Sequence, residues 1–323
     1  MMRNLLRTGG TSCSMILIIL VLTAFITAGC VSEKTMEVNG TEGRIKVIAT
    51  LFPLYDMAGQ ISGDKAEVIM LLPPGVEAHT YEPRPSDISK IAQADIFLYA
   101  GAGMEPWAQS LIKGAENNNL LILDASTKVT LITAGQLPAG EEAEGNGVVD
   151  PHIWLDFSND MILADAIAKA MSEKDPQDAA YYSANAEAYK SRLKDLDELY
   201  NKTLSGCKKR EFITGGHNAF TYLAVRYNLS GISAYGLSPD SEPTPMRIKE
   251  IDDLVKSHGF KYILFEDTVS PKVADALAEG TGAKTLAFSP GENPSKDDYE
   301  AGVSFISLME RNLDTLNIAL ECN

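Results

Sequence analysis

Three of the four histidines in this 323-residue chain stand in contexts suited to metal binding. The segments are Pro73-Pro74-Gly75 leading to His79, Asp150-Pro151-His152, and Gly215-Gly216-His217. We expect each of these histidines in a tight turn after a strand, with His217 opening a helix. Open parallel sheets bind ligands at the carboxyl ends of their strands, so these positions suit a binding site. Singly, each is more often a structural residue than a ligand, but three equivalent placements favour a shared role. Three neutral imidazoles and one carboxylate are typical of tetrahedral zinc.

The fourth histidine needs no role in metal binding. His258 lies in Lys256-Ser257-His258-Gly259, a pattern that predicts the C-terminus of a helix. An imidazole there is favoured by the helix dipole alone.

Catalysis is the main alternative to metal carriage for the other three histidines, because three imidazoles and an open position also hold catalytic zinc. The sequence has no His-Glu-x-x-His motif, which argues against that alternative. Four protein ligands would leave no position for water and would indicate carriage, whereas an open position beside a pocket would indicate hydrolysis. Adhesion or scaffolding at a surface is a third class, and no feature of the sequence favours it.

The composition indicates a folded, acidic protein. Apolar residues make up 45% of the chain and charged residues 22%, which is ordinary for globular domains. The length corresponds to two domains of roughly 150 residues each. The formal charge is −16, and a surface of that sign repels phosphate backbones, so we expect no nucleic-acid partner.

Residues 1–29 have the features of a secretory signal peptide of the lipoprotein kind. Two arginines precede an uncharged apolar stretch, and small residues lead directly to Cys30. A membrane-spanning helix is the alternative, but serines interrupt the apolar run early. We expect cleavage before Cys30, lipidation of its thiol, and a flexible tether over residues 30–44. The domain would then lie at the outer face of the cell membrane, in an extracytoplasmic compartment.

Export implies an oxidising compartment, in which the remaining cysteines are expected to pair. Cys207 and Cys322 remain once the signal peptide is removed and Cys30 is acylated. A disulfide between them would close a loop of over a hundred residues, for which chain-entropy models give about 4–5 kcal/mol of stabilisation. The alternative is two buried thiols.

Alternating strand and helix patterns predict an α/β protein with two lobes. Strands are expected at 46–50, 66–72, 96–100 and 120–123, and in the second lobe at 211–214, 231–234, 262–265 and 284–288. Such alternation indicates mainly parallel sheets flanked by helices. The expected lobes span residues 45–175 and 206–323. Between them, apolar side chains recur every three or four residues over 176–205, which predicts one long rigid helix. We expect this helix to join the lobes.

Several motifs, in sequence order, resemble the zinc-binding lipoproteins of ABC importers, the cluster A-I family of solute-binding proteins. They are 72–75 with 79–83 and 85–87, 150–156, 217–220 with 222–224, 242–245, and 309–313. These segments span nearly the whole mature chain. The resemblance implies two lobes bridged by a rigid helix, with a metal held in the cleft by His79, His152 and His217. It also implies delivery of the metal to a membrane permease by a protein that is not an enzyme. We expect it to be a monomer.

The fourth ligand is implied less directly. Many relatives carry aspartate in a Leu-Asp-Pro segment where this chain has Phe288-Ser289-Pro290, and serine is a poor zinc ligand. The zinc-specific lipoproteins that the chain resembles use a glutamate in this loop, which points to Glu292. Glu266, at the end of another predicted strand, and water are the alternatives. Glu292 would in that case be an exposed loop acid.

The type of ligand also bears on the metal. Three imidazoles and one carboxylate favour Zn²⁺, whereas manganese sites prefer more oxygen donors. Manganese importers of this family usually have glutamate in place of the third histidine, which here is His217. Zn²⁺ is therefore the expected cargo, with manganese or iron as alternatives.

Overall fold

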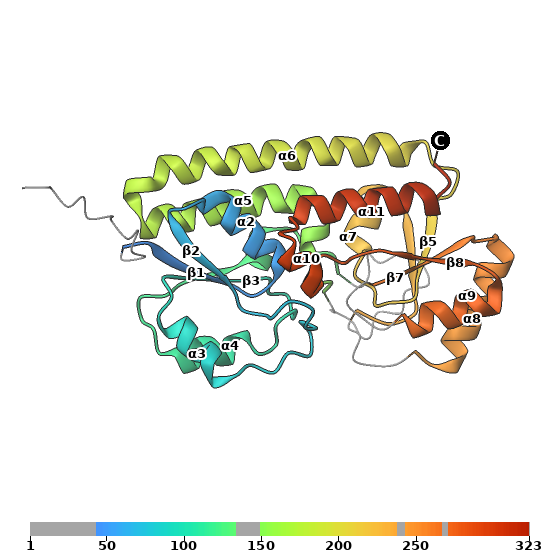
Figure 1. Cartoon of the computed structure of the whole chain (residues 1–323), viewed down its shortest axis with the longest axis horizontal. Helices are drawn as coiled ribbons and strands as arrows, with labels where there is room; N and C mark the ends of the chain where they lie inside the picture. Colours follow the sequence, from blue (N-terminus) through green and yellow to red (C-terminus); the bar gives the residue numbers. More distant parts are fainter. Residues whose placement is uncertain (1–42, 134–148, 238–242, 267–270, 323) are drawn as a thin grey trace, which may run out of the picture. The chain divides into compact units, whose positions relative to one another are not determined.

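The computed structural model describes residues 43–133, 149–237, 243–266 and 271–322 (Figure 1). The predicted signal peptide, the predicted lipidation site at Cys30 and most of the predicted tether lie outside these residues. Within the described residues, no helix combines the length and the apolar composition that a membrane span requires.

A four-stranded parallel sheet forms the first lobe. Its strands are β1 (Ile45–Ala49), β2 (Ala66–Met70), β3 (Ile96–Tyr99) and β4 (Leu121–Asp124), in the order β2-β1-β3-β4. The two central strands, β1 and β3, are almost entirely buried, as strands covered on both faces must be. The strand order reverses between β1 and β3, and open α/β sheets bind ligands at such a point.

Helices cover both faces of this sheet. They are α2 (Phe52–Ser62), α3 (Pro85–Ala92), α4 (Ala108–Ala115) and α5 (Phe157–Lys174), with short 3-10 turns η1 (Ala125–Lys128) and η3 (Ile153–Leu155). Figure 1 shows α2 and α5 on one face and α3 and α4 on the other. Asp156 is the N-cap residue that precedes α5, and its side chain accepts a hydrogen bond from the Ser158 amide (2.8 Å).

The second lobe repeats this architecture. Its strands are β5 (Glu211–Thr214), β6 (Ser230–Ser233), β7 (Tyr262–Phe265) and β8 (Lys284–Ala287), all parallel, in the order β6-β5-β7-β8. Its helices are α7 (Thr221–Arg226), α8 (Pro245–His258), α9 (Lys272–Thr281), α10 (Lys296–Glu300) and α11 (Phe305–Ala319). The sheet again reverses its order between its two central strands, β5 and β7, which makes the ends of these strands a second candidate for ligand binding.

A long helix, α6 (Ala179–Ser205), joins the lobes after a 3-10 turn, η4 (Pro176–Asp178). Its buried side chains are Tyr182, Ala186, Tyr189, Leu193, Leu196, Tyr200 and Leu204. Their spacing of three or four residues gives the helix one apolar face. This face packs on α2 and α5 of the first lobe and on α11 near the C-terminus (Figure 1). The expectation of two α/β lobes joined by one long helix is confirmed.

The ends of the second lobe are tied together beside α6. Cys207, two residues after α6, forms a disulfide with Cys322, which follows α11. The Lys209 amide also donates to the Leu320 carbonyl (3.0 Å). These links hold α11 against the long helix.

The boundaries of the strands differ little from those expected. β5 and β7 have the predicted limits, whereas β2 ends at Met70, two residues early. The Leu71 amide still donates to the Ala49 carbonyl (2.8 Å), so the chain leaves the sheet only after this bond. The loop that carries His79 begins there.

Candidate metal centre

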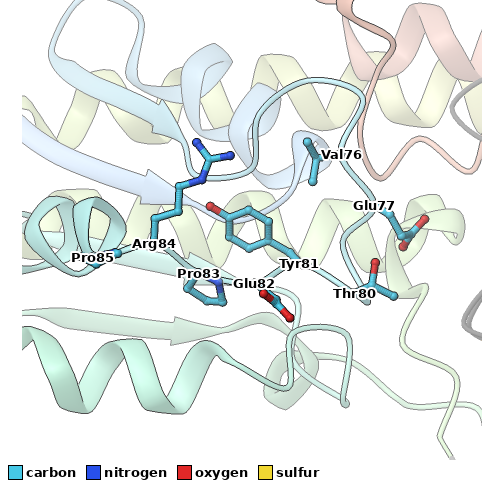
Figure 2. Close-up of a pocket in the computed structure, with 8 residues that line it drawn as sticks. All are labelled: Val76, Glu77, Thr80, Tyr81, Glu82, Pro83, Arg84 and Pro85. Carbon is cyan, nitrogen blue, oxygen red and sulfur yellow. The ribbon is translucent and has the colours of Figure 1, made fainter.

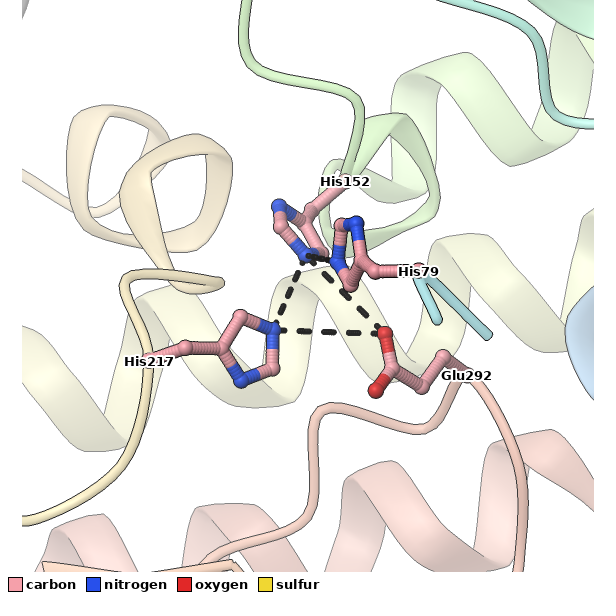
Figure 3. A group of neighbouring side chains, drawn as sticks. All are labelled: His79, His152, His217 and Glu292. Carbon is pink, nitrogen blue, oxygen red and sulfur yellow. Dashed lines mark hydrogen bonds and ion pairs between the residues drawn. The ribbon is translucent and has the colours of Figure 1, made fainter. Parts of the chain in front are cut away.

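Four side chains from distant parts of the sequence meet at one point. His79, His152, His217 and Glu292 each offer one donor atom, and these four atoms lie within 4.8 Å of one another. Figure 3 shows the three rings and the carboxylate pointing toward a common centre. All four residues named from the sequence are therefore brought together.

Parallel strands deliver three of the four residues. His79 lies in the loop after β2, His217 in the loop after β5 and Glu292 in the loop after β8. These loops leave the carboxyl ends of their strands, where ligand sites of open α/β sheets form. The prediction that His217 opens a helix was wrong, because α7 begins only at Thr221.

His152 reaches the site by a different route. It precedes η3, and among the described residues just before it Val149 forms an isolated antiparallel bridge with Thr133 and belongs to no named strand. The expectation that all three histidines follow strand ends was therefore wrong for His152. The Asp150 carboxylate accepts from the His152 backbone amide (2.9 Å), so a local turn fixes its position.

The donor atoms lie nearly as close together as they would around a zinc ion. His152 Nε2 lies 3.4 Å from His79 Nε2 and 3.1 Å from His217 Nε2. Glu292 Oε2 lies 3.9 Å from His152 Nε2 and 4.0 Å from His217 Nε2. A tetrahedral ion with bonds of about 2.0–2.1 Å requires ligand atoms about 3.3–3.4 Å apart. Small side-chain shifts would thus suffice to bind one.

Two buried carboxylates set the orientation of the rings. His152 Nδ1 lies 2.8 Å from Asp150 Oδ1, and His217 Nδ1 lies 2.9 Å from both carboxylate oxygens of Glu266. A carboxylate can only accept, so each Nδ1 carries a proton and Nε2 is the nitrogen left to bind a metal once it has no proton. The Nε2 atoms face one another, an arrangement that a shared cation would stabilise.

Glu266 supports a ligand in this geometry and does not join the cluster. Besides the ring, its Oε1 accepts from the His217 backbone amide (2.6 Å). The approach is so close that a Cβ on Gly216 would lie 1.8 Å from Glu266 Oε1. The sequence placed Glu266 at a strand end but did not reveal this role. For Asp150, its position two residues before His152 was the signal in the sequence that it could orient that ring.

Glu292 supplies a buried oxygen that lacks a partner. Its side chain is almost fully buried, and within the described residues its Oε2 has no hydrogen-bond donor. Burial raises the pKa of Glu292 to about 8, because a charge is costly in this environment. The preceding Gly291 has a φ of +73°, a turn conformation that glycine adopts without strain. A cation at the centre of the cluster would provide the missing partner.

The histidines differ in their affinity for protons. Burial lowers the pKa of His79 to about 2, helped by the neighbouring His152 and His217. Burial also lowers the pKa of His152, although Asp150 opposes the shift. For His217 burial again acts to lower the pKa, but the charge and hydrogen bond of Glu266 outweigh it and raise the pKa to about 10. His217 is therefore the ring for which a metal must compete most strongly with a proton.

His79 is the partly exposed member of the cluster, since the other three are at most 2% exposed. Within the described residues no carboxylate forms a hydrogen bond with its ring. Its backbone amide donates to Glu77 Oε1 (3.0 Å), and Trp107 Nε1 donates to the Ala78 carbonyl (3.4 Å). The loop is thus braced while the ring remains the exposed edge of the site.

A separate pocket of about 530 Å³ lies against the same loop (Figure 2). Its lining comprises Val76, Glu77 and residues 80–85. None of the four clustered side chains lines it, so this pocket is distinct from the candidate metal centre. His258 is also separate from the centre: it is the last residue of α8, and its Nδ1 lies 2.9 Å from Glu211 Oε2.

Two parallel α/β lobes and a buried cluster of three imidazoles and one carboxylate define a two-lobed metal-binding protein. A family model bears out this class and specifies it. The chain belongs to the ZnuA family, described as zinc-uptake complex component A, periplasmic, whose model matches residues 47–319.

Relatives and solved structures agree with this assignment. The chain is 35% identical over 304 residues to the high-affinity zinc uptake system protein ZnuA of Bacillus subtilis, covering 91% of this chain and 94% of that protein. It is 34% identical to the zinc-binding lipoprotein AdcA of Streptococcus pneumoniae, covering 91% of this chain but 58% of that longer protein. The Zn(II)-bound ZnuA-like domain of S. pneumoniae AdcA superposes with a TM-score of 0.74 at 33% identity, over 86% of this chain and all of that domain.

Proposed function

We propose that this protein is the extracytoplasmic zinc-binding component of an ABC importer. It captures Zn²⁺ with His79, His152, His217 and Glu292 and delivers the ion to a membrane permease. One observation carries the proposal: one nitrogen of each histidine lies within 4.8 Å of a buried Glu292 oxygen that has no hydrogen-bond partner within the described residues. The names of the relatives, a zinc uptake protein and a zinc-binding lipoprotein, support it.

Zinc fits this donor set better than manganese does. Three imidazole nitrogens and one carboxylate oxygen suit Zn²⁺, while Mn²⁺ favours sites richer in oxygen. The similar ZnuA-like domain is described as Zn(II)-bound. Zn²⁺ is therefore the proposed cargo.

Carriage also fits the coordination better than catalysis does. A hydrolytic zinc site keeps one position for water. Here the fourth position faces Glu292, whose oxygen lies about as far from His152 as from His217. With four protein ligands the ion has no vacant position for a substrate, so the proposed role is not enzymatic.

The proposed organisation of the full chain follows from the sequence. Residues 1–29 form a signal peptide, and residues 30–44 form a tether lipidated at Cys30. The lobes are residues 45–175 and 206–323, and the connecting helix spans 176–205. The protein would act as a monomer anchored at the outer face of the membrane, and the lipoprotein name of the AdcA relative supports the anchor.

Zinc content and competition affinity of the signal-free protein test the proposal. We expect one tightly bound zinc per chain in the parent. His217→Ala and Glu292→Ala should weaken zinc binding strongly, because each removes one of four ligands. His258→Ala is the matched control and should bind as the parent does, because His258 is bonded to Glu211. A parent that binds no zinc would contradict the proposal, and so would His217→Ala binding as tightly as His258→Ala.

A further inference from the structure

The segment that carries Glu292 follows β8 of the second lobe, yet its hydrogen bonds lead to the first lobe. The bonds run from the Phe52 amide to the Glu292 carbonyl (2.9 Å), from the Gly75 amide to the Pro294 carbonyl (2.9 Å) and from Trp154 Nε1 to the Pro290 carbonyl (2.8 Å). The donors belong to α2, to the His79 loop and to the turn after His152. Glu292 is therefore held against the lobe that carries His79 and His152.

Asn293 makes the most direct of these connections. Its side chain is 2% exposed, and its Nδ2 donates to the carbonyls of Pro73 (2.8 Å) and Val76 (2.7 Å). Both carbonyls belong to the loop that carries His79. One amide group thus spans more than two hundred residues of sequence and holds two ligand-bearing loops together.

The other end of the segment is fastened differently. Asn312 of α11 forms two hydrogen bonds with the backbone of Ser289, one to its amide (2.9 Å) and one to its carbonyl (2.7 Å). This attachment belongs to the second lobe and leaves the residues near Glu292 free of it. The position of Glu292 relative to His79 is consequently set by the bonds around Asn293.

We propose that Asn293 is a positioning residue of the zinc site: it fixes Glu292 against the His79 loop before zinc arrives. Three prospective ligands, His79, His152 and Glu292, are then held together on the first lobe. The second lobe contributes His217, whose ring and amide are bonded to Glu266 at the end of β7. This partition rests on the proposed zinc-binding function, but the bonds that define it need no zinc.

The test compares Asn293→Ala with Asn117→Ala. Asn117 is a matched control because its Nδ2 also donates to two backbone carbonyls, those of Ile91 (3.3 Å) and Ala94 (2.8 Å), away from the cluster. We expect Asn293→Ala to weaken zinc affinity about 10- to 100-fold, as loss of a residue that orients a metal ligand does. Asn117→Ala should leave the affinity unchanged. Equal zinc affinities for the two variants would overturn the inference.

A double-mutant cycle separates positioning from general destabilisation. If Asn293 acts through Glu292, then adding Asn293→Ala to Glu292→Ala should weaken zinc binding by less than it does in the parent. A full and additive loss in both backgrounds would overturn the inference. The cycle measures how far the two substitutions depend on each other in their effect on zinc affinity. A merely structural role of Asn293 would produce no such dependence on Glu292.

Hydrogen exchange in the zinc-free protein gives a readout that does not depend on metal. The amides of Phe52 and Gly75 should be equally protected with and without zinc, because their acceptors near Glu292 stay docked. Loss of protection at both amides on removing zinc would overturn the inference even if Asn293→Ala does not fold. If the parent fails to bind zinc while both amides stay protected, the proposed function is refuted instead. The docking of the Glu292 segment on the first lobe would then stand, but it would not position a zinc ligand.

Discussion

Glu266 holds His217 by both its ring and its backbone. The carboxylate accepts from the ring at Nδ1 (2.9 Å) and from the backbone amide (2.6 Å). The two residues follow neighbouring strands, β7 and β5, so the pairing of these strands sets their approach. A carboxylate behind a ligating histidine fixes the tautomer and raises the basicity of the ring.

Replacing this carboxylate should weaken zinc binding without removing a ligand. We expect Glu266→Gln to lower zinc affinity about 10- to 100-fold, because the uncharged amide stabilises the zinc-bound imidazole less well. Chelator competition measures the change. Glu279→Gln, on the exposed surface of α9, is the control for loss of one negative charge, and an equal effect of both substitutions would contradict the prediction.

The close contact with Gly216 leads to a second prediction. Gly216→Ala would place Cβ 1.8 Å from Glu266 Oε1, so either the carboxylate or the His217 loop must move. We expect a clear loss of zinc affinity in the same competition assay. Gly236→Ala is the matched control, because nothing lies within 4 Å of a Cβ at that position. The prediction fails if the two alanine variants bind zinc equally well.

Strand runs and the period of the long helix could be predicted from the sequence because they depend on local patterns. β5 and β7 have their predicted limits, and α6 keeps its apolar face over its whole length. The error at His217 arose from equally local reasoning. The chain continues for four residues, 217–220, before α7 begins at Thr221, and the bond from the His217 amide to Glu266 is a long-range contact that local patterns do not reveal.

The candidate site was predictable to a lesser extent. Distinctive local motifs singled out the histidines, whereas Glu292 was named only through a family resemblance. The bonds of Asn293 to Pro73 and Val76 left no local signal, since the partners are more than two hundred residues apart. Glu266 was weighed as a ligand because a strand end gives position but not the direction of a side chain.

The proton affinities of the site predict a pH-dependent effect of zinc. The pKa values of Glu292 and His217 are raised to about 8 and about 10. Both groups therefore stabilise the zinc-free fold at low pH and lose that contribution as pH rises through the folded pKa values. The pKa values of His79 and His152 are lowered in the fold. Below pH 6.5 these residues therefore gain protons in the unfolded chain first, which disfavours the folded state.

Zinc displaces the protons of Glu292 and His217, so its stabilising effect should increase with pH. We expect the rise in melting temperature at a fixed, buffered free-zinc concentration to be larger at pH 8 than at pH 6.5. Scanning calorimetry with and without zinc measures it, and Glu292→Ala should show a weaker dependence. A gain that is constant or smaller at pH 8 would show that these protons are not displaced.

Glu105 should be needed for stability and not for zinc binding. Its buried carboxylate accepts from Thr50 Oγ1 (2.5 Å) and from the amides of Ala100 (2.9 Å) and Gly101 (3.0 Å). Glu105→Ala leaves three donors without an acceptor, at a cost of about 1–3 kcal/mol each. We expect the free energy of unfolding in urea to fall by about 3 kcal/mol or more. Exposed Glu82→Ala is the control, and similar stabilities for the two variants would refute the prediction.

Zinc K-edge X-ray absorption of the zinc-loaded protein measures directly whether four protein ligands surround the ion. We expect one zinc per chain with four nitrogen or oxygen neighbours at about 2.0–2.1 Å. The spectrum should show outer-shell scattering from three imidazoles in the parent and from two in His217→Ala. An ion with five or six neighbours, or a spectrum that neither His217→Ala nor Glu292→Ala alters, would contradict a zinc carrier closed by four protein ligands.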